Sequence, residues 1–555
     1  MTTKNHGSLP EIHSHPISWR EKILQLNYLL VRTDNQDTLF SLSTLLRDIL
    51  NGLQENVETG EISVGEYTEC MIVLYKMTAY TRDLVAGKGE YTLAYMMIVV
   101  WNDFFPGLAK YALQCFVLSP EPYLLQPFGS WKDMKYFCDY CLEDNVRKNM
   151  DLILYAFSLL NKQLKLDEYA PTNKLSLAAK WVPREKSKRF GWIFHYLAKD
   201  YYPNCSEKKA NRQYRRLLSR LNTELDTIQI KMCNYEWDTI DHTKTTSITL
   251  MKQSKALLNL NESASIERRL CANYLKKEIL ENEFNKTFMK GKHVSMSSFV
   301  ERAIYLLEEE QNQATQATQA IQATQATQEN QIQTFSYLKM LLNSQWKDYT
   351  FSLEDFSNPI LPLIDTSLPR EKLYEAIGMA IYLAEKSTPG RRVMTYSSIA
   401  TWHNLDHCKD FTDRVKVIIE NREKDWGLTP NLSYALDKIT NVMTDCHMTQ
   451  HEKATWTLVV FSPSSSPTIT ENMAPMKIVY WNMHSDDPFL KVSATMKERN
   501  MSILSGNQPS LLNVLNASSH YTFERKEWMA WKQLRKLVDH ERYKCMENKM
   551  KEWIL

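Results

Sequence analysis

The chain has 555 residues, of which 43% are hydrophobic, and its formal net charge is only +2. A chain of this length exceeds what one hydrophobic core usually serves, so two or more domains are expected. Near neutrality excludes a protein that is basic throughout, and any nucleic-acid surface must be a local patch. Glycine is scarce, with 14 residues, which favours helices over loops and tight hairpins.

The sequence predicts a cytoplasmic protein of a reducing compartment with no membrane contact. No window approaches about 18 uninterrupted apolar residues, which excludes a membrane span. Residues 1–17 form a polar tail that is expected to be disordered and that lacks the apolar stretch of a signal peptide. The ten cysteines are scattered without the spacing of a disulfide framework.

The pattern of residues 18–310 is helical, because apolar side chains recur at spacings of three and four. Breaks at 103–107 and 119–122 separate the helices, which suggests antiparallel pairs or a solenoid. No strict repeat is present, so the pattern favours an all-α domain over a solenoid. The clearest apolar stripe consists of Leu39, Leu42, Leu45, Leu46, Ile49, Leu50 and Leu53.

Two motifs in this helical part are explained better by structure than by function. Gly87-Lys88-Gly89 lacks the spacing and the preceding strand of a phosphate loop, so a basic turn between helices is favoured. Cys138 and Cys141 form a C-x-x-C pair, but structural zinc needs four ligands and no second pair is present. We expect two buried helical cysteines.

The stretch 180–220 departs from the neutrality of the chain, with twelve Lys or Arg residues against three Asp or Glu. Clustered cations neutralise phosphates and release counterions, while interleaved aromatic rings can stack on unpaired bases. The alternative is a solvated helix face whose aromatics belong to the core. For the aromatics we favour that alternative, and for the charges the two interpretations are equally supported. The predicted phosphate contacts are Lys180, Arg184, Lys186, Lys188, Arg189, Arg212, Arg215 and Arg216.

A low-complexity tract marks a change of pattern. Repeats of Gln-Ala-Thr at 313–327 cannot form an apolar stripe, so residues 311–345 are expected to be a linker and lead-in. From 346 to 520, apolar runs alternate with helical segments, which indicates a mostly parallel sheet with helices on both faces. Residues 521–555 are expected to form a last helix that packs back on the body. The expected strands are 360–365, 392–396, 457–461, 477–481 and 501–504, and the expected helices are 370–386, 411–421, 432–446 and 509–516.

The first expected strand ends in Asp365-Thr366-Ser367. In open α/β sheets, ligands bind beyond the carboxyl ends of the strands, and two side-chain oxygens in one turn suit a hard cation such as Mg²⁺. Asp, Thr and Ser also simply end strands and cap the helix that follows. From this stretch alone the second interpretation is favoured.

The chain resembles the TROVE-module, Ro-type RNA-binding proteins, and more closely their relatives in the domain of unknown function 2828 family. The resemblance implies a multidomain fold, with an all-α HEAT-like helical array followed by an α/β von Willebrand factor A-like (Rossmann-like) domain. The segments that carry it occur in the family's order: TRDLVAGKGE (81–90), GSWKDMKYF (129–137), LAAKWVPREKS (177–187), KMCNYEWDTID (231–241), PLIDTS (362–367), DWGLTPN (425–431), TLVVFS (457–462) and KIVYWNM (477–483).

The resemblance also implies a function. In Ro-type proteins the helical array is a ring that holds single-stranded RNA ends in a basic cavity and duplex on its outer face. The segment LAAKWVPREKS falls inside the basic stretch at 180–220, so charge and resemblance indicate the same region. An RNA with structure and a single-stranded end is therefore the expected partner.

The family's metal-ion-dependent adhesion motif is eroded here. Its D-x-S-x-S element is matched by Asp365 and Ser367, but the second Ser position is Pro369. Its Thr and its second Asp coincide with Pro430 and Pro463, which have no side-chain oxygen. A divalent ion held by so few protein groups would keep most of its water and bind weakly. We expect no cofactor, with weakly bound Mg²⁺ at this degenerate site as the exception.

Three classes of function compete. The first is a non-enzymatic RNA-binding or ribonucleoprotein scaffold. The second is a structural or protein–protein module, such as a virion component, that uses the face above Asp365; a lineage whose sequence drifts fast, such as a large DNA virus, would account for the repeats and the lost ligands. An enzyme is the third and is not expected, because no nucleophile–base pair or metal set is found. His447 and His451 are four residues apart, but Met448 stands where a zinc protease has Glu.

Overall fold

The computed structural model confirms the predicted fold class, because helices dominate up to residue 351 and a six-stranded sheet follows. It describes residues 18–33, 35–120, 126–145, 147–260, 265–319, 325–351, 356, 358–387, 390–420, 429–463, 476–483, 501–505 and 526–554. None of the helices in these ranges combines the length and the apolarity that a membrane crossing needs.

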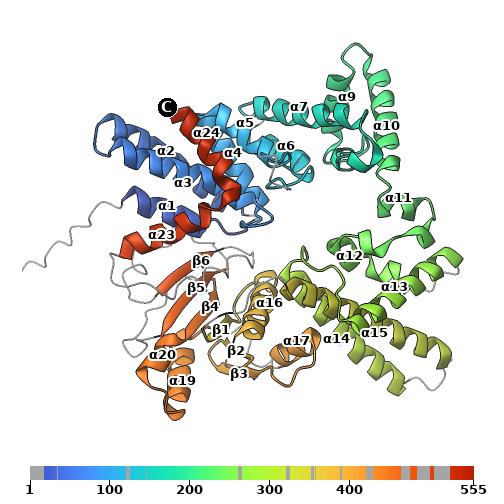
Figure 1. Cartoon of the computed structure of the whole chain (residues 1–555), viewed down its shortest axis with the longest axis vertical. Helices are drawn as coiled ribbons and strands as arrows, with labels where there is room; N and C mark the ends of the chain where they lie inside the picture. The colour runs from blue at the N-terminus through green and yellow to red at the C-terminus, as the bar shows by residue number, and fades with distance from the viewer. Residues whose placement is uncertain are drawn as a thin grey trace, which may run out of the picture.

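The helical part runs from the upper left of Figure 1 across the top and down the right side. Its elements are α1 (Trp19–Leu29), α2 (Gln36–Glu58), α3 (Val64–Arg82), α4 (Tyr91–Phe104), α5 (Pro106–Cys115), α6 (Lys132–Asn145), α7 (Met150–Asp167), α8 (Ala178–Trp181), α9 (Gly191–Tyr201), α10 (Glu207–Glu224), α11 (Ile228–Cys233), α12 (Ser247–Leu257), α13 (Ile266–Asn285), α14 (Met296–Gln319) and α15 (Gln325–Phe351). The last two helices extend into the Gln-Ala-Thr repeats.

Helix α2 shows how the sequence forms these elements. Asn35 caps its first turn by accepting hydrogen bonds from the amides of Asp37 and Thr38. The predicted leucine stripe is buried along one side of the helix, apart from the half-buried Leu45. The stripe faces α1, α3 and α4, so burial of one apolar face holds this end of the array together.

The sheet has the strand order β3-β2-β1-β4-β5-β6. Five strands are parallel, and β3 pairs with β2 antiparallel. Strand β3 was not predicted, because it follows β2 after a turn of only three residues and carries no apolar run. The strands are β1 (Ile360–Asp365), β2 (Arg392–Tyr396), β3 (Ala400–Asn404), β4 (Thr457–Ser462), β5 (Lys477–Asn482) and β6 (Met501–Ser505).

The helices of the α/β part are α16 (Arg370–Lys386), α17 (Phe411–Ile419), α19 (Leu432–Asp445) and α20 (Gln450–Thr455). Helix α20 was not predicted, and the helix predicted at 509–516 lies outside the described residues. Helix α16 packs on β1 and β2, and α14 of the helical part packs in turn on α16 and α17.

The C-terminal segment forms two helices instead of the single one predicted for 521–555. Helix α23 (Lys526–Val538) and helix α24 (Lys544–Ile554) are separated by a 3₁₀ turn, Glu541–Tyr543, that His540 caps. Both helices pack on α3, so the C-terminal segment packs back on the body of the protein as predicted. Lys76 of α3 is buried there between Asp539, at 2.7 Å, and Glu547, at 3.1 Å.

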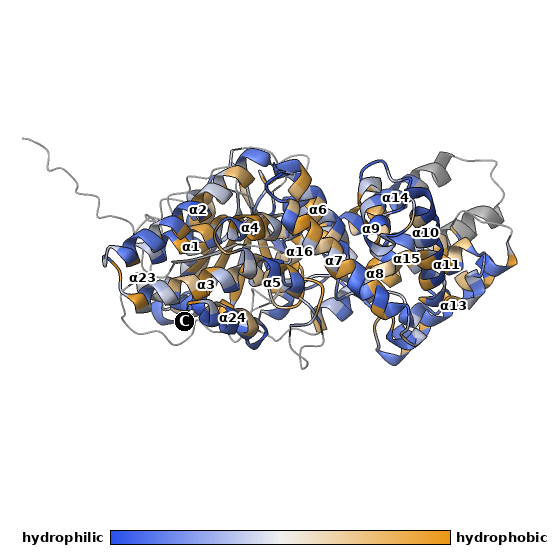
Figure 2. Cartoon of the chain, turned by 90° about the horizontal axis from the view of Figure 1, so that it is seen from above, coloured by the Kyte–Doolittle hydropathy of each residue, from blue (hydrophilic) through white to orange (hydrophobic). Residues whose placement is uncertain are grey.

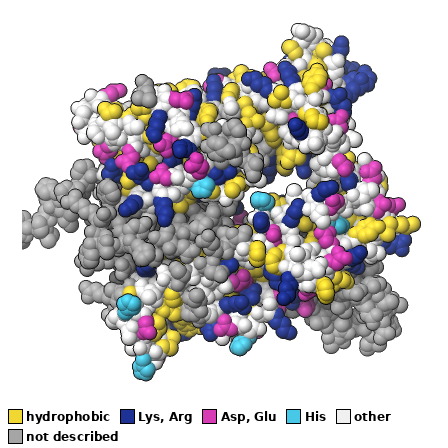
Figure 3. Space-filling view, in the orientation of Figure 1, with side chains coloured by type: hydrophobic (Ala, Val, Ile, Leu, Met, Phe, Trp, Pro, Cys, Tyr) yellow, Lys and Arg dark blue, Asp and Glu magenta, His cyan; other side chains and the backbone are white. Residues whose placement is uncertain are grey.

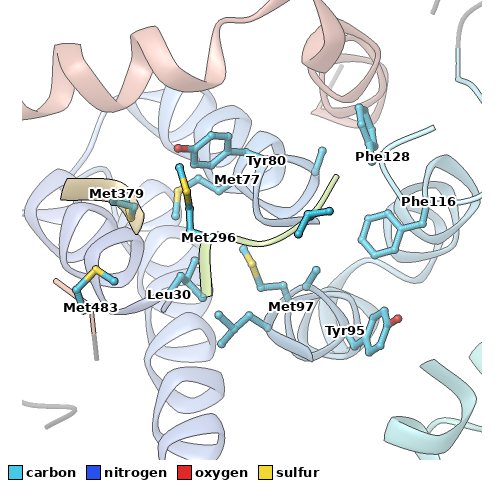
Figure 4. Packing of buried hydrophobic residues seen from close by; sticks show 14 of the residues in the cluster. Leu30, Met77, Tyr80, Tyr95, Met97, Phe116, Phe128, Met296, Met379 and Met483 are labelled. Carbon is cyan, nitrogen blue, oxygen red and sulfur yellow. The ribbon is translucent and has the colours of Figure 1, made fainter. Parts of the chain in front are cut away.

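The α/β part contacts both ends of the helical array, so the array and the α/β part together form a closed loop, which we call the circuit (Figure 1). At one end, α14 lies on α16, and Met296 packs on Gly378. At the other end, α1 contacts β6 and α23. Leu30, Met77, Met296 and Met379 belong to one buried cluster that draws on both parts (Figure 4). Figure 2 shows that hydrophobic residues concentrate in this half of the molecule, around α4 and α16, whereas α10 is largely hydrophilic.

Charged groups are buried at the contact between α16 and the N-terminal helices. Arg32 binds Glu90 at 3.0 Å and lies 3.9 Å from Glu371 of α16. One turn along α16, Glu375 is only 3% exposed, and its nearest cation is the buried Lys372 at 3.6 Å. Burial raises the pKa of Glu375 to about 7, against the opposing effect of Lys372 and Arg32.

The variant Glu375→Gln is expected to be more stable than the wild type near neutral pH. Between pH 4.5 and about pH 7 the folded chain binds more protons at Glu375 than the unfolded chain, so wild-type stability falls as the pH rises through this window. Glutamine carries no titrating proton. The difference in free energy of unfolding should be near zero at about pH 4.5 and on the order of 3 kcal/mol above pH 7. Urea unfolding across this range measures it, and a difference that does not change with pH would contradict the assignment.

Candidate nucleic-acid interface

Helix α10 presents a cationic face to solvent. Its inner face packs on α8 and α9 through buried side chains such as Tyr214 and Leu217. The outer face carries basic residues at helical spacings of three and four, so they lie along one side of the helix. Figure 3 shows Lys and Arg side chains gathered over α10, at the upper right. The exposed cations are Lys208, Lys209, Arg212, Arg215, Arg216 and Arg220.

Some of these cations already have an acidic partner. Arg215 pairs with Glu185, and Arg220 binds Glu168 at 3.0 Å. Among the residues that the structure describes, Lys208, Lys209, Arg212 and Arg216 form no ion pair. These four residues, which we call the α10 face, can meet an external anion without breaking an internal bond.

The other predicted residues lie in and around the segment that joins α8 to α9. Lys180 is half-buried, and Arg184, Lys186 and Lys188 are exposed. Arg189 donates to Asp139 of α6 and lies 3.6 Å from Glu143. Arg189 and Arg215, both predicted phosphate contacts, are therefore engaged within the protein.

A pocket of about 550 Å³ opens beside Trp181. Four cations line it, one from α6, one from α8 and two from the segment after α8, together with the rings of Trp181 and Phe190. No Asp or Glu is among the lining residues. We call this site the Trp181 pocket; its cations are Lys135, Lys180, Arg184 and Lys186.

Two lysines of the pocket, Lys135 and Lys180, stand over aromatic rings. The Lys135 ammonium is 5.0 Å from the Trp181 ring centroid and 5.4 Å from that of Phe190, and the Lys180 ammonium is 5.9 Å from Trp181. Burial lowers the pKa of both ammonium groups, and for Lys135 the neighbouring Lys132 lowers it further. Cation–π attraction compensates part of the desolvation.

The contribution of α6 to the pocket was not predicted. Lys132 and Lys135 lie in GSWKDMKYF, one of the segments of the family resemblance, but far from the basic stretch in sequence. Most aromatics of the basic stretch are buried or half-buried, as expected, whereas Tyr196 is 53% exposed.

The predicted metal residues meet at the carboxyl end of the sheet, between the central strands β1 and β4. Asp365 is buried, and its Oδ1 accepts hydrogen bonds from the amide of Ser367, at 2.9 Å, and from its hydroxyl, at 2.6 Å. Its Oδ2 accepts from Ser462 at 2.8 Å and from Tyr396 at 3.5 Å. Asp365 therefore links the ends of β1, β2 and β4.

Mg²⁺ at these residues stays a prediction. Asp365 is a single carboxylate whose two oxygens already accept protein donors, so a divalent ion here would take most of its ligands from water. Within the described ranges, no three Asp, Glu, His or Cys side chains are placed to share a metal ion. Next to this site, Asn482 donates to the backbone oxygen of Tyr28, so the N-terminal helices approach the end of β5.

The remaining candidate motifs are structural. The Lys88 ammonium is buried and donates to the backbone oxygens of Asn27 and Leu30, so Gly-Lys-Gly is no phosphate loop. A side chain at Gly87 would meet the Tyr80 oxygen at 2.0 Å. Cys138 and Cys141 are free and buried, as predicted. His447 follows the end of α19 and His451 belongs to α20, so the two do not share one helix.

Comparisons with known proteins identify no family. No family model matches the chain, so membership of the domain of unknown function 2828 family stays a prediction. An uncharacterised protein, L728, of Acanthamoeba polyphaga mimivirus is 23% identical over 413 residues. The match covers 71% of this chain and 64% of that protein, so the chain spans less than two thirds of its viral relative.

Among solved structures, the Ro (RSR) protein of Deinococcus radiodurans aligns with 90% of this chain and 99% of its own length. The TM-score is 0.30 and the sequence identity is 12%. At this TM-score and identity, nothing about the function of this chain follows from the alignment. The charges and contacts described above are the basis of the proposed function.

Proposed function

We propose that this chain is a non-enzymatic RNA-binding scaffold whose contact surface is formed by the α10 face and the Trp181 pocket. The observation that carries the proposal is the concentration of unpaired cations there in a chain of net charge +2. Several buried cations elsewhere have acidic partners, for example Arg82 with Asp133 and Arg542 with Asp83.

The geometry supports a backbone-binding mode. Cations along one side of an 18-residue helix, which spans about 27 Å, can follow several phosphates and release their counterions. The pocket includes Lys180 and Trp181 of α8, the helix that packs on α10, so one RNA could engage both. We propose a structured RNA with a single-stranded end as the ligand, and a cytoplasmic or, for a viral protein, virion location.

The α/β part has a bracing role in this proposal. It contacts both ends of the helical array and holds the circuit closed, while Asp365 serves as a hydrogen-bonded link between strands. No step of the proposed function passes through a metal ion.

Purification without nuclease tests the proposal. We expect RNA to accompany the protein at low salt, to raise the ratio of absorbance at 260 and 280 nm, and to be released at high salt. Sequencing the released RNA identifies the ligand. A protein that is free of nucleic acid, and that also fails to bind a structured RNA with a free 3′ end, would refute the RNA scaffold. Capture of a protein partner that is insensitive to salt would then favour the alternative, a structural or protein–protein module.

A further inference from the structure

The Trp181 pocket holds more positive charge than the protein itself neutralises. In the described part of the chain, Lys135, Lys180, Arg184 and Lys186 form no ion pair with a carboxylate. Lys132 stands at the rim, 5.9 Å from the Trp181 ring. Its neighbour Asp133 is already held by a two-point ion pair with Arg82 and by Tyr95. The pocket lining therefore carries four cations and no carboxylate.

This arrangement lowers the stability of the free protein. Lys135 and Lys180 are half-buried and Lys132 is exposed, and desolvation lowers the pKa of all three ammonium groups. Asp133 attracts the Lys132 ammonium and opposes this shift, whereas Lys252 of α12 and Arg82 repel it. Cations that are desolvated and close together are retained at a cost in folding free energy, which a bound anion would offset.

The ligand chemistry follows from what the pocket offers. Lysine ammonium groups already lie over Trp181 from three positions, 132, 135 and 180, so that ring gives little free face for a stacked base. The polar groups are almost all N–H donors, three from each lysine and five from the arginine. Such a site matches an anion with several acceptor oxygens and more than one negative charge.

We propose that the Trp181 pocket binds a phosphate monoester group, as carried by an RNA terminus or by a free nucleotide. A monoester carries a charge of about −1.5 to −2 at neutral pH and three acceptor oxygens, whereas a phosphodiester within a strand carries one negative charge. This proposal assigns the end of the RNA strand to the Trp181 pocket and the interior of the strand to the α10 face. Binding of an RNA terminus rests on the proposed function, whereas binding of a free nucleotide does not.

The test compares single-stranded RNAs of one sequence that carry a 5′-phosphate, a 3′-phosphate or hydroxyls at both ends. We expect the full-length protein to bind one phosphorylated form at least tenfold more tightly than the hydroxyl form. The variant Lys135→Gln/Lys180→Gln should lose this preference and bind all three RNAs with the same affinity. The control Lys208→Gln/Arg212→Gln, on the α10 face, should weaken all three RNAs by the same factor.

A second measurement separates the two sources of the phosphate group and does not depend on RNA. Inorganic phosphate and adenosine monophosphate should raise the melting temperature of the wild type and not that of Lys135→Gln/Lys180→Gln. The variant itself should melt at the same or a higher temperature, because it lacks two desolvated cations. If these ligands stabilise the protein but no RNA binds, the pocket binds a free nucleotide and the RNA scaffold is refuted. Equal binding of all three RNAs together with no stabilisation by phosphate would overturn the pocket proposal.

Discussion

Reversal of three charges on the α10 face, Lys208→Glu/Arg212→Glu/Arg216→Glu, is expected to weaken binding of single-stranded RNA about 100-fold at about 0.1 M salt. Each phosphate contact on a single strand contributes a salt slope of about 0.7, so three contacts correspond to about two log units at that salt concentration. The slope of log K against log salt should also decrease by about 2. Fluorescence anisotropy over a salt series measures both quantities, and the loss should be the same for every RNA sequence.

Two controls make this result specific to the α10 face. Lys347→Glu/Lys409→Glu/Lys416→Glu changes the net charge by the same amount at exposed positions around the α/β part, and it should leave RNA affinity within about twofold. Arg215→Gln removes a cation that is already paired with Glu185, and its effect should also be small. If the α10 variant binds RNA like the wild type, or if the distant triple variant loses as much affinity, α10 is not the contact surface.

The local pattern of apolar residues was sufficient to predict most strands and helices of the α/β part. β1 at Ile360–Asp365, β2 at Arg392–Tyr396 and α16 at Arg370–Lys386 have the predicted bounds, because a short apolar run or a 3.6-residue stripe is a property of neighbouring residues. β3 is the exception. Its pairing with β2 is set by a turn in which the Ser397 amide donates to Ile399, and by the antiparallel register that follows.

The sequence did not predict which acidic residue each basic residue binds. The charge excess at 180–220 predicted a basic region, but not that Arg215 binds Glu185 or that Arg189 binds Asp139 of another helix. In the same way, Lys135 reaches the Trp181 ring only because α6 packs on α8. Ion pairs and pockets depend on which surfaces fold together, which composition and periodicity do not encode.

Loss of the Arg542 side chain is expected to cause a large loss of stability. The Arg542 guanidinium donates to both oxygens of Asp83 at 2.8 Å, and Tyr543 donates to the same carboxylate at 3.0 Å. The side chain of Asp83 is fully buried and that of Arg542 is 10% exposed. In Arg542→Leu the carboxylate would stay buried without its cation, which costs about 3–5 kcal/mol of unfolding free energy.

The double variant Asp83→Asn/Arg542→Leu separates the ion pair from the rest of the contact. It should recover more than half of the loss, because no isolated charge remains buried, and the coupling energy from the four-member cycle should be on the order of 2 kcal/mol or more. Arg220→Leu serves as the exposed counterpart, since its pair with Glu168 is half-open to solvent and should contribute less than about 1 kcal/mol. Urea unfolding measures all four variants, and similar losses for Arg542→Leu and Arg220→Leu would contradict the burial argument.

The variant Arg542→Leu also tests how the circuit is held closed. Asp83 and Arg542 are 459 residues apart in sequence, and their bond joins the turn after α3 to the segment between α23 and α24. Hydrogen exchange should therefore quicken in α24 and α3 of Arg542→Leu before it changes in α10, which contacts neither helix. RNA affinity measured at a temperature where the variant is still folded should stay near the wild-type value. Closure of the circuit and binding of RNA would then be separable properties of one chain, the first set by buried ion pairs and the second by unpaired surface charge.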